Sequence, residues 1–182
     1  MTDEMVRGIE APIFSEPEDV EPEANWGILI GGMASYDEEF MAKAYKEAAD
    51  MLVEQALRRK HRSWEVAPPI LFLYRHTVEL YLKRVVKPKE RNHSLSELVE
   101  EASEIAKRRV GKSIPNWAKA RLLEFADCDP RSTTFRYADG RAPLPFGESW
   151  IHLDHLRRVM EILTAGLAKL ATLCDVQRAG TP

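Results

Sequence analysis

The sequence predicts an all-α protein: an up-and-down helical bundle of four to five helices, with a long irregular loop before the last helix. Apolar residues recur at helical spacing in several stretches of the 182-residue chain. These stretches are bounded by capping residues, prolines or glycines. No long stretch alternates apolar and polar residues as a half-buried strand would, which favours an antiparallel bundle.

Charge is divided unevenly along the chain. Residues 1–34 hold eight acidic side chains and one basic residue, Arg7, which gives −7, so the total of −3 leaves +4 on the remaining 148 residues. The stretch SEPEDVEPEAN, Ser15–Asn25, combines proline with carboxylates and has too few apolar residues to order itself. We therefore expect residues 1–34 to be an acidic flexible arm, residues 35–175 the bundle and residues 176–182 a C-terminal tail.

Several classes of protein are excluded by what the sequence lacks. No apolar run reaches the ~20 residues that cross a bilayer, and the first residues lack the basic-then-apolar layout of a secretory signal. Cys128 and Cys174 show no paired spacing, which suits a reducing compartment. There is no phosphate-binding glycine loop, nucleophile elbow or paired-cysteine zinc motif. We expect a cytoplasmic protein with no membrane contact and no cofactor.

The first two helices are predicted from their ends. Ser35 and Glu38 have the spacing of a capping box, so the first helix should open at Ser35. It should end in the basic run Arg58–Arg62, since cations suit the C-terminal end of a helix. Pro68 and Pro69 should start the second helix, PPILFLYRHTVELYLKRVV. That helix is apolar on nearly every side, which is typical of a central, buried helix.

The remaining helices follow the same signals. Ser94 and Glu97 repeat the capping-box spacing before the third helix, and Gly111 is its predicted stop. Pro115 should begin a short fourth helix. The last helix is predicted from Ser149 to Leu173.

A long irregular segment, Phe125–Gly147, separates the last two helices. Helix connections usually take about 2–8 residues, and longer ones tend to be functional or disordered. Its side chains Arg131, Arg136 and Tyr137 are predicted to bind a ligand. Arg136, flanked by aromatics, would present its guanidinium to a phosphate and a base. The alternative is that the aromatics anchor the loop while Arg136 pairs with Glu79 or an aspartate.

One narrow polar strip runs along the second helix. At 100° per residue, an arc of ~100° holds four side chains: Arg75, His76, Glu79 and Lys83. In the functional interpretation, Glu79 or His76 carries a proton while Arg75 or Lys83 holds an anion. The alternative is an ion-pair ladder of i,i+4 spacing at a helix seam or facing solvent.

Three further histidines could take part in chemistry. His93 precedes a predicted N-cap and would meet a phosphate held by the helix end, or would merely pack over the first turn. His152 and His155 lie three residues apart and, with Asp127 or Asp129, could bind a divalent metal. That spacing is common by chance and no second motif supports it, so we predict no metal site.

Four parts of the chain together resemble a known pattern: YRHTVELYLKRV, NHSLSELVEEA, DPRSTTFRYADG and the amphipathic last helix. Over about residues 36–173 the chain resembles the HEPN-like helical bundles of prokaryotes. The resemblance implies a four- or five-helix bundle that is usually a homodimer. Many members are metal-independent RNases of toxin–antitoxin and defence systems, and others are non-catalytic RNA-binding or scaffold domains.

The catalytic signature of those RNases is absent from this chain. It consists of an Arg, four to six residues and then a His, and none of the five histidines has an Arg at that distance upstream. Any RNase activity would therefore use another set of residues. The predicted catalytic residues are Glu79 and His93, with Arg75, Arg131 and Arg136 as neighbours if the loop folds over the second helix.

Two functions of different classes follow from these observations. The first is a HEPN-like homodimer that binds RNA or another phosphate-bearing ligand, with degenerate or divergent RNase activity, of a toxin–antitoxin, phage or defence type. The second is a non-catalytic interaction or scaffold module whose acidic arm, through residues 1–25, binds a protein partner.

Overall fold

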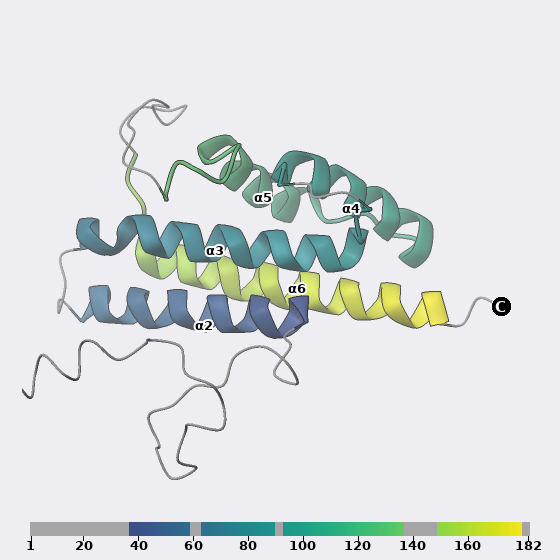
Figure 1. The fold of residues 1–182 in the computed structure, drawn as a ribbon, viewed down its shortest axis with the longest axis horizontal. Coiled ribbons are helices and arrows are strands. Elements are labelled where there is room, and N and C mark those ends of the chain that lie inside the picture. The colour runs from purple at the N-terminus through teal and green to yellow at the C-terminus, as the bar shows by residue number, and fades with distance from the viewer. Residues whose placement is uncertain (1–36, 59–62, 90–92, 137–148, 180–182) are drawn as a thin grey trace, which may run out of the picture. The chain divides into compact units, whose positions relative to one another are not determined.

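The computed structural model describes residues 37–58, 63–89, 93–136 and 149–179. These ranges hold five helices (Figure 1): α2 (Glu38–Leu57), α3 (Ser63–Val86), α4 (Leu95–Val110), α5 (Asn116–Cys128) and α6 (Leu153–Ala179). No strand occurs in the same ranges, and the predicted all-α bundle is confirmed. The chain divides into two units, Met1–Ser35 and Tyr36–Pro182. The described residues all belong to the second unit, and the predicted acidic arm lies outside them.

The start of α2 differs from the prediction. Asp37 is the N-cap, and its carboxylate accepts the backbone N–H of Phe40 at 2.8 Å. The predicted cap at Ser35 is therefore wrong. An aspartate satisfies an orphan N–H as well as a serine does, and its charge also favours the positive end of the helix dipole. α2 ends at Leu57, and residues 59–62 of the basic run lie outside the described residues.

The start of α3 also differs. The helix begins at Ser63, and Pro68 and Pro69 lie inside it rather than at its first turn. Neither proline has a backbone N–H, so neither can donate the usual bond to the carbonyl four residues earlier, at Trp64 or Glu65. Both prolines lie beyond the first four residues of the helix, whose N–H groups have no intrahelical acceptor, so each proline costs the helix one backbone hydrogen bond.

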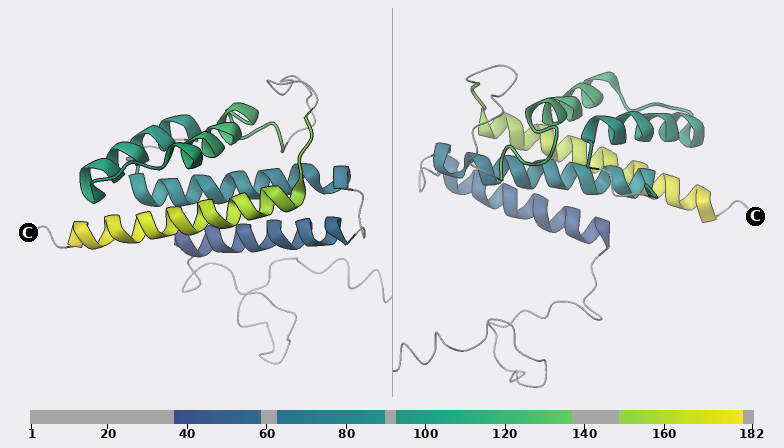
Figure 2. Two further views of the ribbon diagram at one scale, coloured as in Figure 1. Left: turned by 180° about the vertical axis from the view of Figure 1, so that it is seen from behind. Right: turned by 45° about the horizontal axis from the view of Figure 1, so that its top comes forward.

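α3 is the central helix, as its apolar sequence predicts. It packs against α2, α4 and α6, and the three views show α2 and α6 alongside it with α4 and α5 on its other side (Figures 1 and 2). One face of α3 is completely buried: Tyr74, Val78, Leu82 and Val85. Tyr74 also donates its hydroxyl to Asp50 of α2 at 2.6 Å. Burial and this bond raise the pKa of Tyr74.

α4 begins and ends as predicted. The Ser94 hydroxyl accepts the backbone N–H of Glu97 at 3.5 Å, and Gly111 ends the helix with a φ of 74°. This left-handed conformation costs glycine little, because it has no Cβ. α5 then starts at Asn116, directly after Pro115, and ends at Cys128, so residues 125–128 are helical rather than part of the predicted irregular segment.

α3 and α4 run in the same sense, so this pair departs from the up-and-down arrangement that the sequence predicts. The start of α4 lies beside the middle of α3, where Arg75 bonds to the carbonyl of His93. The end of α4 lies beside the end of α6, where Arg109 donates to the carbonyl of Cys174 at 3.0 Å. The end of α3 is close to the same place, because Arg84 pairs with Asp175. This direction places the residues before α4 against the polar strip of α3.

α6 is shifted along the sequence relative to the prediction. It starts at Leu153, four residues after Ser149, and continues to Ala179, so residues 176–179 are helical rather than part of a tail. Its buried face consists of Met160, Leu163, Thr164, Leu167, Ala171 and Cys174. Among the helices of the described ranges, none has the length and apolar character of a membrane span.

Candidate functional site

Arg75 is the centre of a buried polar cluster. Its side chain is 0% exposed, and its guanidinium donates three hydrogen bonds to three different parts of the chain. Nε bonds to the carbonyl of Asp129 at 3.0 Å, Nη1 to Oε2 of Glu79 at 2.8 Å and Nη2 to the carbonyl of His93 at 3.2 Å. One side chain thereby joins α3, the start of α4 and the turn after α5.

Glu79 lies next to Arg75 and is 1% exposed. Its Oε1 accepts the Lys83 ammonium at 2.6 Å and Nδ1 of His93 at 2.7 Å, while Oε2 accepts Arg75. Burial alone would raise the pKa of Glu79. The hydrogen bonds from Lys83 and His93, together with the charges of Lys83 and Arg75, outweigh burial and hold that pKa below its ordinary value. Glu79 is therefore a fixed carboxylate and a poor proton donor.

Asp129 closes the cluster from the turn after α5. It is 0% exposed, and its Oδ2 lies 3.3 Å from Nε of Arg75. Its Oδ1 accepts the backbone N–H groups of Thr133 at 2.7 Å and Thr134 at 3.0 Å. A carboxylate that bonds to its own backbone a few residues on is a common way to fix a turn. Within this turn Ser132 has a φ of 57°, a conformation that such side-chain bonds stabilise.

From the sequence, Asp129 is expected in the loop, as a possible metal ligand, and not beside the polar strip of α3. The signal that could have found it is the Asp-Pro pair directly after a helix, followed by two threonines, DPRSTT. That pattern is typical of an aspartate that caps a turn. Its pairing with an arginine 54 residues earlier has no counterpart in local sequence.

His93 is the member of the cluster that reaches the surface. Its side chain is 59% exposed, while its Nδ1 contacts the buried Glu79 and lies 3.5 Å from the Lys83 ammonium. A carboxylate partner favours a proton on Nδ1, which leaves Nε2 as the nitrogen that exchanges protons. A carboxylate, an oriented imidazole and a lysine at its edge are the parts of an acid–base site that handles an anion.

His76 does not join this hydrogen-bonded cluster. It packs instead against two aromatic rings, stacked on Phe72 with the centroids 5.8 Å apart and edge-to-face with Tyr45 at 4.6 Å. Burial lowers the pKa of His76, and the charges of Lys83 and Arg75 act in the same direction. The polar strip of four predicted residues thus divides into an ionic part and an aromatic part.

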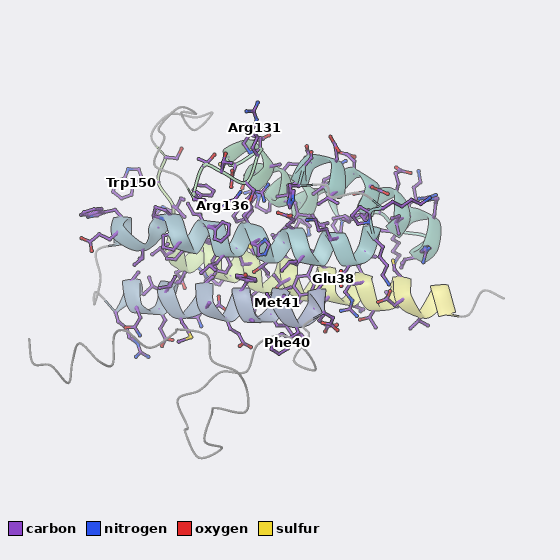
Figure 3. All side chains as sticks on the ribbon, in the orientation of Figure 1. Glu38, Phe40, Met41, Arg131, Arg136 and Trp150 are labelled. Atoms are coloured by element: carbon purple, nitrogen blue, oxygen red, sulfur yellow. The ribbon has the colours of Figure 1, made fainter. Side chains whose placement is uncertain are left out.

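The loop residues lie at different places around the cluster. Arg136 donates from Nε to the carbonyl of Ser132, and its guanidinium carbon lies 5.8 Å from the centre of the Phe72 ring. Arg131 is exposed and points away from the helices (Figure 3). The Glu79 oxygens are bonded to Arg75, Lys83 and His93. The cluster therefore does not show the Arg136–Glu79 pair that was one of the predicted alternatives. Tyr137 lies outside the described residues.

His152 and His155 lie elsewhere, on a cavity of about 390 Å³ beside α5 and the start of α6. Its walls are mainly apolar and include Phe125, Phe135 and Leu156. Within the described part of the chain, no three His, Cys, Asp or Glu side chains gather in a way that could hold a metal ion. Cys128 also lines this cavity, and burial raises the pKa of its thiol, which disfavours the reactive thiolate.

The cluster therefore unites residues from three of the four parts of the chain on which the predicted pattern rests. Arg75 and Glu79 come from the first, His93 from the second and Asp129 from the third. Comparison of the chain with models of protein families, with curated proteins and with solved structures gives no match.

Proposed function

We propose that this protein binds RNA or another phosphate-bearing ligand at the surface around His93 and Lys83, and that His93 carries a proton there. The observation that supports this most is the bond of 2.7 Å between the exposed His93 imidazole and the buried Glu79 carboxylate. A histidine held by a carboxylate keeps one tautomer and one orientation, which is what proton transfer at a fixed atom requires.

The charges around His93 favour an anion. Inside the cluster Arg75 and Lys83 balance Glu79 and Asp129. Three further cations are exposed on the segments that flank the cluster: Lys89 after α3, and Arg131 and Arg136 after α5. Phosphate groups are the anions that such clusters of lysine and arginine recognise in nucleic acids.

RNA cleavage is the reaction for which these groups would be suited. His93 would take the proton of a 2′-hydroxyl through Nε2, the 2′-oxygen would attack the adjacent phosphorus, and the 5′-oxygen would leave and gain a proton from water. Lys83 would stabilise the charge that develops on the phosphate. The part of Glu79 would be to hold His93, because its lowered pKa keeps it ionised. Divergent RNase activity with His93 and Glu79 is the enzymatic form of the proposal.

Kinship with the HEPN-like bundles belongs to the same proposal. It is supported by the five helices of the described ranges and by the meeting of three of the quoted motifs at Arg75. The proposal also includes a homodimer. The exposed apolar side chains Ile162 and Val176 of α6 are candidates for the contact between the two subunits. Free thiols at Cys128 and Cys174 suit the reducing cytoplasm in which we expect the protein to act.

The assay of this function compares two histidine variants on labelled RNA. His93→Gln keeps a hydrogen-bonding side chain but cannot exchange protons, and His155→Gln changes an exposed histidine on another helix. If the protein is an RNase, His93→Gln should lower the cleavage rate by 100-fold or more, as is typical of a lost general base. His155→Gln should cleave as wild type does. Equal loss in both variants, or none in either, contradicts the role of His93.

A non-catalytic interaction module remains the second candidate function. It is favoured by the charge of −7 on residues 1–34 and by exposed apolar side chains on α2, including Phe40 at 53% (Figure 3) and Met51 at 67%. Deletion of residues 1–25 separates the two candidates. If the arm recruits a basic protein partner, the deletion should abolish its capture, whereas an arm that competes with phosphate should give stronger RNA binding when removed.

A further inference from the structure

A row of flat side chains continues the polar strip of α3 toward its N-terminal half. The Arg136 guanidinium lies over the Phe72 ring, Phe72 is stacked on His76 with an angle of 6° between the rings, and His76 meets Tyr45 edge-to-face. All three rings are only partly buried. They therefore lie at the surface, whereas Tyr74 and Val78 lie on the core face of α3.

This row and the ionic cluster share one stripe of α3. At 100° per residue, Phe72, His76, Glu79 and Lys83 fall within an arc of about 60°. The eleven helical steps from Phe72 to Lys83 cover about 16 Å along the helix at 1.5 Å per residue. Nucleotides stacked at about 3.4 Å would place some five units over that length. Planar groups therefore stand at one end of the stripe, and the lysine and the oriented histidine stand at the other.

Planar cationic and aromatic groups recognise a particular part of a nucleotide. A base stacks on an aromatic ring or on the plane of an arginine, and each such contact is sequence-tolerant because every base has a flat face. Arginine suits this position because its guanidinium is planar and always charged, whereas lysine offers only a point charge. The turn that Asp129 fixes positions Arg136 for this contact, since Arg136 bonds to Ser132 within that turn.

We infer that the exposed Arg136 guanidinium, backed by the Phe72 ring, forms a stacking site for an unpaired nucleobase, whose strand continues along α3 to Lys83 and His93. The inference rests on the proposed function and deepens it, because it assigns the base to one end of the stripe and the reacting phosphate to the other. A base inside a duplex cannot reach this site, because both of its faces are covered by its neighbours.

The test uses two strands with equal numbers of phosphates. One is an octamer of adenosine and the other is an eight-unit abasic RNA strand, both labelled at the same end and titrated with the full-length protein at ~50 mM salt. Wild type should bind the adenosine strand about tenfold more tightly, since one stacked base contributes roughly that factor. Equal affinity for the two strands overturns the stacking site while phosphate recognition stands. No binding of either strand overturns the proposed function as well.

Three variants locate the effect. Phe72→Leu keeps apolar packing but removes the aromatic face, and Arg136→Lys keeps the charge but removes the plane. Each should weaken binding of the adenosine strand several-fold and leave the abasic strand unchanged. Trp117→Leu, a partly exposed aromatic of α5, is the control and should change neither. Arg136 is exposed, so its variant tests the inference even if Phe72→Leu does not fold. Equal weakening of both strands by Arg136→Lys would show a phosphate contact only and would overturn the stacking site.

Discussion

His93 Nδ1 lies 2.7 Å from Oε1 of Glu79, and this bond joins a side chain that is 59% exposed to one that is 1% exposed. The two residues are 14 positions apart: Glu79 lies on α3, and His93 lies in the segment just before α4. Their contact depends on Arg75, which holds the backbone of His93 and the other oxygen of Glu79 at the same time. A surface imidazole is thus fixed by a buried ionic cluster, which gives the cluster both a structural and a chemical role.

Replacement of Arg75 by methionine should strongly destabilise the protein. Methionine fills similar space but removes the ion pair of the buried Asp129 and one of the three partners of the buried Glu79. Loss of one member of a buried pair typically costs about 3–5 kcal/mol. The free energy of unfolding in urea measures this cost. Arg58→Met, which breaks an exposed pair with Glu54, is the control and should cost less than about 1 kcal/mol. Equal costs for the two variants would show that the cluster contributes no more than a surface pair.

Replacement of Glu79 by glutamine should remove part of the acid sensitivity of folding. The pKa of Glu79 lies below its ordinary value of 4.5 in the folded protein, so its charged form stabilises the fold. That contribution is present above the unfolded pKa and is lost as the pH falls through the folded pKa. Glu79→Gln should therefore be less stable than wild type at pH 7, and the difference should shrink below about pH 4.5. A constant difference from pH 7 to pH 3 would contradict the assigned shift.

Replacement of His76 by phenylalanine should act at a higher pH. Burial holds the pKa of His76 below its ordinary value of 6.5, so the fold favours the neutral ring. The unfolded chain takes up this proton first, and the free energy of unfolding of wild type should fall as the pH drops below about 6.5. His76→Phe keeps an aromatic ring between Phe72 and Tyr45 but cannot titrate. Its unfolding free energy should fall less between pH 7 and 5, and an equally steep fall would exclude His76 as the cause.

Two substitutions of Asp129 should separate its charge from its role in the turn. Asp129→Asn keeps an oxygen for the backbone N–H groups of Thr133 and Thr134 and loses only the charge beside Arg75. Asp129→Ala loses both. Alanine should therefore cost about 1 kcal/mol more than asparagine, since two partly buried donors lose their acceptor. Hydrogen exchange at Thr133 and Thr134 should quicken in the alanine variant alone. Equal exchange in both variants would show that the side chain does not fix this turn.

Helix class and both ends of α4 could be predicted because they depend on local sequence. Ser94 and Gly111 cap α4 through contacts within one turn, and the apolar pattern of α3 identified it as the central helix. The starts of α2 and α3 were predicted wrongly because competing local signals exist there. Asp37 and Ser35 are both good caps, and a proline can lie inside the early turns of a helix as well as at its first residue.

The sequence predicted that side chains of α3 and His93 belong to the candidate site, but it did not predict how they contact one another. Helical spacing placed Arg75, Glu79 and Lys83 on one strip, and it also placed His76 there, because an angular position does not say which neighbour a side chain meets. The pairing of Arg75 with Asp129 depends on how α5 packs across the bundle. Contacts at that sequence distance leave no periodic pattern from which a single sequence could reveal them.

The salt dependence of RNA binding tests the central claim most directly. Anisotropy of a labelled RNA would be measured between about 50 and 200 mM salt for wild type, Lys83→Met and the control Lys169→Met, which removes an exposed lysine of α6. Wild type should show a linear fall of log affinity with log salt, and Lys83→Met should reduce the slope by about one phosphate contact while Lys169→Met leaves it unchanged. No binding by wild type at ~50 mM salt, or equal slopes for the two variants, would contradict a phosphate site at Lys83 and His93.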